Sequence, residues 1–125
     1  MQLINIATRQ RLEAFHPEAA AEIANLELVL DSSSLNPDVL TLCADYVDAT
    51  LAGEPWETPA SAGDLGNACL DVCEQFMISV ADIREEQIRA LRNHLTADDV
   101  YNLMSAIYLI EMSRRLDHTL ERVLS

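Results

Sequence analysis

Apolar residues recur at intervals of three and four along most of this chain, and this spacing constrains the fold more than any other feature. The interval persists longest between residues 97 and 123, where it forms two stripes. One stripe holds Val100, Leu103, Met104, Ile107 and Ile110, and the other holds Leu109, Met112, Leu116, Leu120 and Val123. Such spacing puts side chains on helix faces, whereas a half-buried strand needs strict alternation. No alternation longer than four residues occurs, so we predict an all-α fold.

Proline and capping residues divide the chain into predicted helices. Two helices are expected to begin at Pro17 and Pro37, because proline suits the first helical position. Three more are expected near Ser61, Asp82 and Thr96, each of which has an acidic residue three positions later, as in a capping box. The last of these helices is expected to be long and to lie at the centre of the molecule, because it is apolar on more than one face.

The chain has 125 residues, which is the size of one ordinary domain. We predict a single helical domain over residues 1–125, a compact bundle of five or six helices. Residues 1–15 are expected to form an arm or a short helix. Residues 53–60 contain two prolines and the only tryptophan, so they are expected to form a loop.

The charge is strongly negative, with 8 basic against 21 acidic residues and a net charge of −13. Nucleic acid and anionic membrane surfaces both require basic side chains, so neither is an expected partner. All the basic residues are arginine, which excludes lysine chemistry. A basic protein partner would suit this charge. No signal peptide or membrane-spanning stretch is apparent, so we expect a cytoplasmic protein.

Three cysteines, Cys43, Cys69 and Cys73, lie inside apolar helical segments. Cys69 and Cys73 share one helix face, but the redox motif would need two intervening residues and a helix N-terminus. We therefore expect buried, reduced thiols. A thiol oxidoreductase that uses one of the three remains an alternative.

The sequence predicts no metal site and no cofactor. The three histidines, His16, His94 and His118, are far apart, and within the predicted helices no two metal ligands stand at His-x-x-x-His or Glu-x-x-His spacing. Glycine-rich phosphate loops and nucleophile elbows are also absent.

Acid–base chemistry has one candidate constellation. Glu111, Arg114, Arg115 and His118 fall within two turns of the last predicted helix and interrupt an apolar segment. If that segment is buried, a charged neighbour and low dielectric would shift their pKa values toward catalytic use. Glu74, inside another apolar stretch, is a further candidate for a buried carboxylate. The alternative is a salt-bridge ladder on the surface.

The second half of the chain resembles a known family. The matching residues are Cys73-Glu74-Gln75-Phe76, Leu91-Arg92, His94-Leu95, Asp98-Asp99-Val100 and Arg115-Leu116. This pattern is similar to the C-terminal half of the carboxymuconolactone decarboxylase and alkylhydroperoxidase-like family. The resemblance covers a little under half of the chain. It implies an alkylhydroperoxidase-like, all-helical fold and assembly into a homo-oligomer.

The thiol relay of that family is missing from this sequence. Its redox members carry Gly-Cys-x-x-Cys after the helix that corresponds to residues 39–53. Here Gly53 is followed by Glu54-Pro55-Trp56-Glu57, so glutamates stand at the two cysteine positions. Ser61 stands near the expected histidine and Leu42 near the expected glutamate. The resemblance therefore does not imply peroxidase activity.

Two functions remain close alternatives at this point. The first is a divergent member of the family that performs cofactor-free acid–base chemistry on a small molecule, using Glu74, Glu111, Arg115 and His118. The second is a non-catalytic acidic helical protein that mediates oligomeric assembly or binds a partner.

Overall fold

The computed structural model describes residues 1–124, and within that range it contains helices and no β-strand. The helices are α1 (Ile6–Phe15), α2 (Pro17–Asp31), α3 (Pro37–Ala52), the 3-10 helix η1 (Ala60–Ala62), α4 (Gly63–Ser79), the 3-10 helix η2 (Val80–Asp82), α5 (Glu85–Arg92) and α6 (Ala97–Leu124). The prediction of an all-α fold with five or six helices and a long last helix is confirmed.

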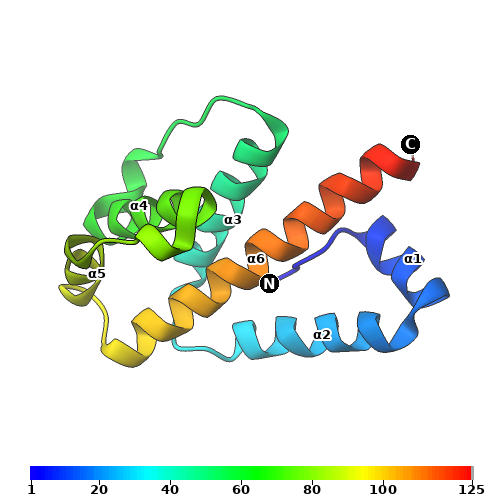
Figure 1. Cartoon of the computed structure of the whole chain (residues 1–125). Coiled ribbons are helices and arrows are strands. Elements are labelled where there is room, and N and C mark those ends of the chain that lie inside the picture. Colours follow the sequence, from blue (N-terminus) through cyan, green and yellow to red (C-terminus); the bar gives the residue numbers. More distant parts are fainter. Residues whose placement is uncertain (125) are drawn as a thin grey trace.

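Helix α6 runs through the whole molecule, with α3, α4 and α5 grouped around its first half and the α1–α2 hairpin beside its second half (Figure 1). It has 28 residues, which corresponds to a length of about 42 Å at 1.5 Å per residue. Its most extensive packing is with α3, while α1 packs mainly on α2. Helix α6 therefore packs mainly on α3, and its packing with α1 and α2 is less extensive.

The core lies between α3, α4, α5 and the inner face of α6. Its central residues are fully buried: Cys43 and Val47 of α3, Cys69, Val72 and Cys73 of α4, Leu91 of α5, and Leu103, Ile107 and Ile110 of α6. Burial of such side chains stabilises a fold by about 1.5–3 kcal/mol each. Of the two apolar stripes predicted on the last helix, the one that contains Leu103 and Ile107 enters this core.

Several predicted helix ends are confirmed by their hydrogen bonds. The side chain of Asn36 accepts from the backbone N–H of Asp38 (2.9 Å) at the start of α3. Thr96 Oγ1 accepts from the backbone N–H of Asp99 (3.2 Å) at the start of α6. Gly53 ends α3 in the left-handed region at φ 69°, where a side chain would be strained.

Two predicted helix starts are wrong. Helix α4 begins two residues after Ser61, because the chain first makes the 3-10 turn η1, and no side chain caps it. Asp82 likewise ends η2 instead of capping α5. The start of α5 is capped by Gln87, whose side-chain oxygen accepts from the backbone N–H of Arg84 (2.9 Å). Short 3-10 turns have no apolar period, which is why the spacing did not predict them.

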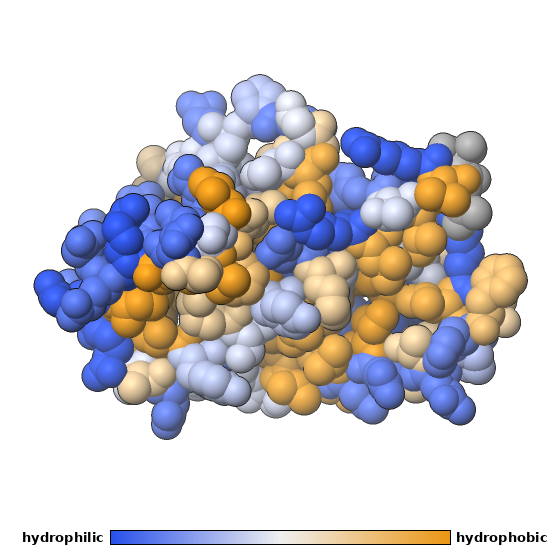
Figure 2. All heavy atoms as spheres, in the orientation of Figure 1, coloured by the Kyte–Doolittle hydropathy of each residue, from blue (hydrophilic) through white to orange (hydrophobic). Residues whose placement is uncertain are grey.

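Hydrophobic residues also reach the outside of the molecule. Figure 2 shows patches of them between the hydrophilic areas, over α2 and the neighbouring part of α6. In the part of the chain that the structure describes, no helix is both long enough and apolar enough to span a membrane.

Candidate functional site on helix α6

The predicted acid–base residues of α6 lie on the side of the helix that is only partly covered. Glu111 is half-buried and Arg115 is exposed, and Arg115 Nε donates to Glu111 Oε1 at 2.9 Å. This bond joins residues four apart, as the sequence predicted. An exposed pair of this kind contributes well under about 1 kcal/mol to stability, so it orients Glu111 more than it stabilises the fold.

His118 contacts a residue that the sequence did not single out. Its Nε2 atom lies 3.8 Å from Asp48 Oδ1 of α3, and Arg114 Nε lies 3.7 Å from the same oxygen. Arg114 also donates from Nη2 to the backbone oxygen of Gln2 (3.3 Å). Arg114 and His118 therefore both face α3 and share a contact with Asp48.

Burial raises the pKa of Asp48, although Arg114 and His118 both lower it. Asp45 and Asp117 add a smaller raising effect, because each is a negative charge nearby. Proton transfer needs titratable groups close together, and Asp48 and His118 are such a pair, although their separation of 3.8 Å is longer than a hydrogen bond. The polar cluster of Asp48, Arg114 and His118 is consequently the part of the molecule best suited to acid–base work.

A small hollow adjoins this cluster. It has a volume of about 200 Å³, and Leu51, Arg115, His118, Thr119 and Arg122 line it. Pockets for drug-sized ligands are commonly larger, about 300–1,000 Å³. The hollow opens to solvent, so it does not exclude water from the groups on its wall. Its basic lining nevertheless suits a small anion in an otherwise acidic protein.

The prediction that Glu74 is a buried carboxylate is wrong. Glu74 is exposed on α4, although its neighbour Cys73 is fully buried. One residue turns an α-helix by about 100°, which carries Glu74 away from the core. None of the contacts described above joins Glu74 to Glu111, Arg115 or His118, so the four predicted site residues do not form one site.

Asp117 is the other polar residue that the sequence analysis missed. It is only 5% exposed, and both of its side-chain oxygens accept from the backbone N–H of Asn5, at 3.0 and 3.2 Å. This contact attaches the start of α1 to the second half of α6. An acidic residue on the inner side of an apolar helix was the available signal, because such residues are seldom buried without a partner.

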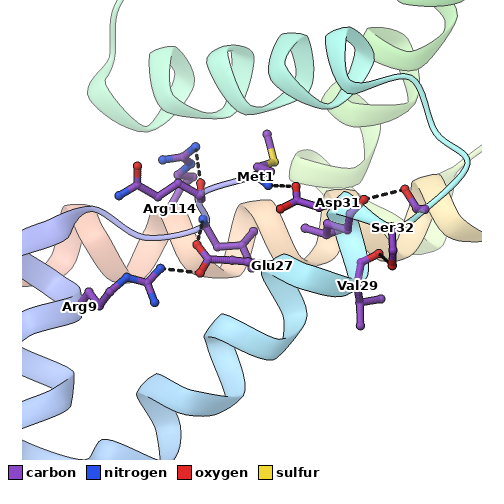
Figure 3. A network of polar contacts seen from close by, with 11 residues as sticks. Met1, Arg9, Glu27, Val29, Asp31, Ser32 and Arg114 are labelled. Atoms are coloured by element: carbon purple, nitrogen blue, oxygen red, sulfur yellow. Dashed lines mark hydrogen bonds and ion pairs between the residues drawn. The ribbon is translucent and has the colours of Figure 1, made fainter.

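Figure 3 shows how further polar contacts hold the N-terminal segment. Glu27 of α2 accepts from the backbone N–H of Leu3 (2.7 Å) and from Arg9 Nη2 (2.5 Å). The N-terminal ammonium group contacts Asp31. A cavity of about 420 Å³ lies beside this segment, between α2, α3 and Arg114. The N-terminal segment thus forms one wall of a cavity.

The outer side of α6 is apolar and exposed. Tyr101 is 73% exposed, Tyr108 57% and Met112 45%, and the exposed Val80 of η2 lines a groove together with Tyr108. We call these four residues the Tyr108 face. The ring of Tyr108 packs edge-on against Phe76 at a centroid distance of 6.5 Å.

A groove of about 480 Å³ crosses the Tyr108 face. Its lining is almost entirely apolar and consists of Phe76, Val80, Met104, Ser105, Tyr108 and Leu109. Ser105 is the one small residue among them. The second apolar stripe of α6 is only partly covered: Met112 and Val123 are exposed, while Leu109, Leu116 and Leu120 are half-buried.

The three cysteines are buried and reduced, as predicted. A hydrogen bond with Cys73 and burial raise the pKa of Cys43 well above its ordinary value. Burial, with a smaller effect from Cys43, raises the pKa of Cys69 to about 12. Thiols with raised pKa values are poor nucleophiles at neutral pH, which weighs against the thiol oxidoreductase.

Metal ligands do not gather in the described part of this fold. Among residues 1–123, no group of three or more histidine, cysteine, aspartate or glutamate side chains is arranged to hold a metal ion. His94 is exposed in the turn after α5, where its backbone N–H donates to the backbone oxygen of Leu91 (3.0 Å).

Comparisons with known proteins add no further assignment. No family model matches the chain, and neither the characterised proteins nor the solved structures contain a match to it. The role of α6 is therefore inferred from its geometry.

Proposed function

We propose that this protein is a non-catalytic assembly protein, which associates with other protein surfaces through the Tyr108 face. The observation that carries this proposal is the exposure of Tyr101, Tyr108 and Met112 on one side of the longest helix. Contiguous exposed apolar surface on a small soluble protein commonly marks an interaction site. Tyrosine and methionine are also residue types that interfaces favour.

The polar cluster supports catalysis less well than the Tyr108 face supports association. The hollow beside His118 is small and open to water, and Glu111 is already paired with Arg115. Catalytic electrostatics gain most of their strength where water is excluded. Glu74, the fourth residue of the catalytic hypothesis, lies outside this cluster.

The first experiment is sedimentation velocity of the purified chain from low to high micromolar concentration. We expect a concentration-dependent oligomer, and we expect Tyr108→Glu to shift it to monomer because a buried unpaired charge is costly. Phe15→Glu is the matched control, since Phe15 is an exposed aromatic residue of α1 away from this face. A wild-type chain that remains monomeric throughout would refute the self-associating form of this proposal.

Salt dependence separates self-association from binding to a basic partner. Two copies that each carry a net charge of −13 repel one another, so added salt should strengthen their association by screening. A complex with a basic protein should weaken as salt increases. Measuring the oligomer at two salt concentrations therefore tests which form of assembly applies.

The second candidate is the divergent, cofactor-free acid–base enzyme that the family resemblance implied. The contact of His118 with Asp48, whose pKa is raised, is the observation that favours it. Titration of the His118 ring signals in NMR with succinate or inorganic phosphate tests the adjoining hollow as a small-anion site. Saturable shifts that disappear in Arg115→Gln would support this candidate, and unchanged signals at millimolar anion would remove it.

A further inference from the structure

Six outward-facing positions of α6 are spaced symmetrically. They are Asp98, Tyr101, Ser105, Tyr108, Met112 and Arg115. The intervals between them run three, four, three, four, three, so the series reads the same from either end. At about 100° per residue they fall within a stripe about 100° wide. All six are exposed, and the opposite side of α6 enters the core.

We propose that the Tyr108 face binds a second copy of this chain, with the two α6 helices antiparallel about a two-fold axis that passes between Ser105 and Tyr108. This inference rests on the proposed assembly function and specifies its partner and geometry. A two-fold contact uses the same surface on both copies, so the surface must complement itself. An antiparallel pair brings each position of the stripe opposite its mirror position.

The three kinds of pair that result are chemically complementary. Asp98 meets Arg115 of the second copy, which pairs an acid with a base. Tyr101 meets Met112 of the second copy, which gives a contact between a sulfur atom and an aromatic ring. Ser105 meets Tyr108 of the second copy, which sets a large side chain against a small one. Each pair occurs twice because of the symmetry.

The groove on the Tyr108 face gives the central pair a place to pack. Ser105 is the smallest residue of its lining, which also contains the apolar residues Phe76, Val80 and Met104. The ring of Tyr108 from the second copy would lie over Ser105 and against those apolar residues. A buried aromatic ring that fills a pocket at the centre of an interface is the usual form of a binding hot spot.

The charges on the stripe favour the antiparallel arrangement over the parallel one. In a parallel pair Asp98 would lie beside Asp98 of the second copy and Arg115 beside Arg115, which is repulsive at both ends. The existing bond from Arg115 to Glu111 does not prevent the contact with Asp98, because a guanidinium group has five N–H donors. Arg115 is also more than half exposed.

Cross-linking tests the direction of the helices. We would prepare Tyr101→Cys and Met112→Cys chains, mix them, and add a short bifunctional maleimide. The antiparallel dimer places residue 101 opposite residue 112 of the second copy, so the mixture should cross-link. Tyr101→Cys alone should not, because its two cysteines would be about 16 Å apart along the helix axis. The wild type is the control for its buried native cysteines.

A charge exchange tests the end pairs independently. Asp98→Arg and Arg115→Asp should each weaken the dimer, by roughly five- to tenfold in Kd, since each creates two like-charge contacts. The double variant restores an opposite pair in reversed order and should recover most of the wild-type affinity. In a parallel dimer the two substitutions would act additively, without recovery.

The possible results separate this inference from the function on which it rests. A monomeric wild type overturns this inference and the self-associating form of the assembly function, and leaves only the form that binds a basic partner. A dimer that forms normally, but whose Tyr101→Cys chain cross-links with itself or whose charge variants are additive, overturns the antiparallel geometry and leaves the assembly function in place. Cross-linking confined to the mixture, together with recovery in the double charge variant, supports the geometry.

Discussion

Replacing Asp117 should release the N-terminal hairpin from α6. Asp117 is nearly fully buried, and its carboxylate accepts from the backbone N–H of Asn5 at 3.0 and 3.2 Å. A hydrogen bond to a charged group contributes about 1.5–3 kcal/mol. We therefore expect Asp117→Ala to lower the free energy of unfolding by about that amount.

The corresponding shift in melting temperature follows from the chain length. An unfolding entropy of about 2.1 cal/mol/K per residue gives about 0.26 kcal/mol/K for a chain of this length, so each kcal/mol shifts Tm by about 4 °C. Asp117→Ala should accordingly lower Tm by about 6–12 °C. Asp117→Asn keeps an acceptor oxygen and should cost clearly less.

Hydrogen exchange should show which helices are destabilised by Asp117→Ala. Helix α1 packs mainly on α2, so we expect the amides of α1 to lose protection in Asp117→Ala before those of α3 and the inner part of α6. Asp117→Leu is the critical variant, because a well-packed apolar side chain can stabilise a fold as much as a buried charge or more. If Asp117→Leu is as stable as the wild type and α1 stays protected, the carboxylate is not what attaches the hairpin.

Three further predictions concern the cysteines, Asp48 and Gly53. In the native state Cys43, Cys69 and Cys73 should fail to react with a thiol reagent at pH 8, and all three should react in denaturant; a fast native reaction would contradict the burial of the three thiols and the raised pKa values of Cys43 and Cys69. Because the folded pKa of Asp48 is raised, its contribution to stability is complete below its unfolded pKa of about 3.9 and is lost as pH rises through the folded pKa. Asp48→Asn should thus match the wild-type Tm in acid and modestly exceed it at pH 7, and a lower Tm at pH 7 would mean that the pairing with its basic neighbours outweighs desolvation. Gly53→Ala should cost about 1 kcal/mol in urea unfolding, because its φ of 69° strains a side chain, whereas Gly53→Asn should cost less.

The elements that the sequence predicted well are those defined by neighbouring residues. The caps at Asn36 and Thr96 and the stop at Gly53 each depend on hydrogen bonds or dihedral angles within a few residues. The starts of α4 and α5 were missed because a short 3-10 turn precedes each one. Such turns are set by how the helices meet, which a local pattern does not contain.

The candidate site was predictable only along a single helix. The bond between Glu111 and Arg115 follows from their spacing of four residues. The contacts of Asp48 with Arg114 and His118 join residues that are far apart in sequence, so they depend on the packing of α3 against α6. The prediction that Glu74 is buried was wrong for a related reason: apolar neighbours in sequence do not determine which side of a helix faces the core.

The inner and outer faces of α6 depend on the same helical register, and this limits how the helix can change in length. Leu103 and Ile107 face the core while Ser105 and Tyr108 face outward. A single residue inserted between them would rotate everything that follows by about 100°. The inner and outer patterns would then be lost together, and the contact between Asp117 and Asn5 with them. We therefore expect related chains to tolerate insertions in the loop before α4 but none within α6, even where individual side chains there are replaced.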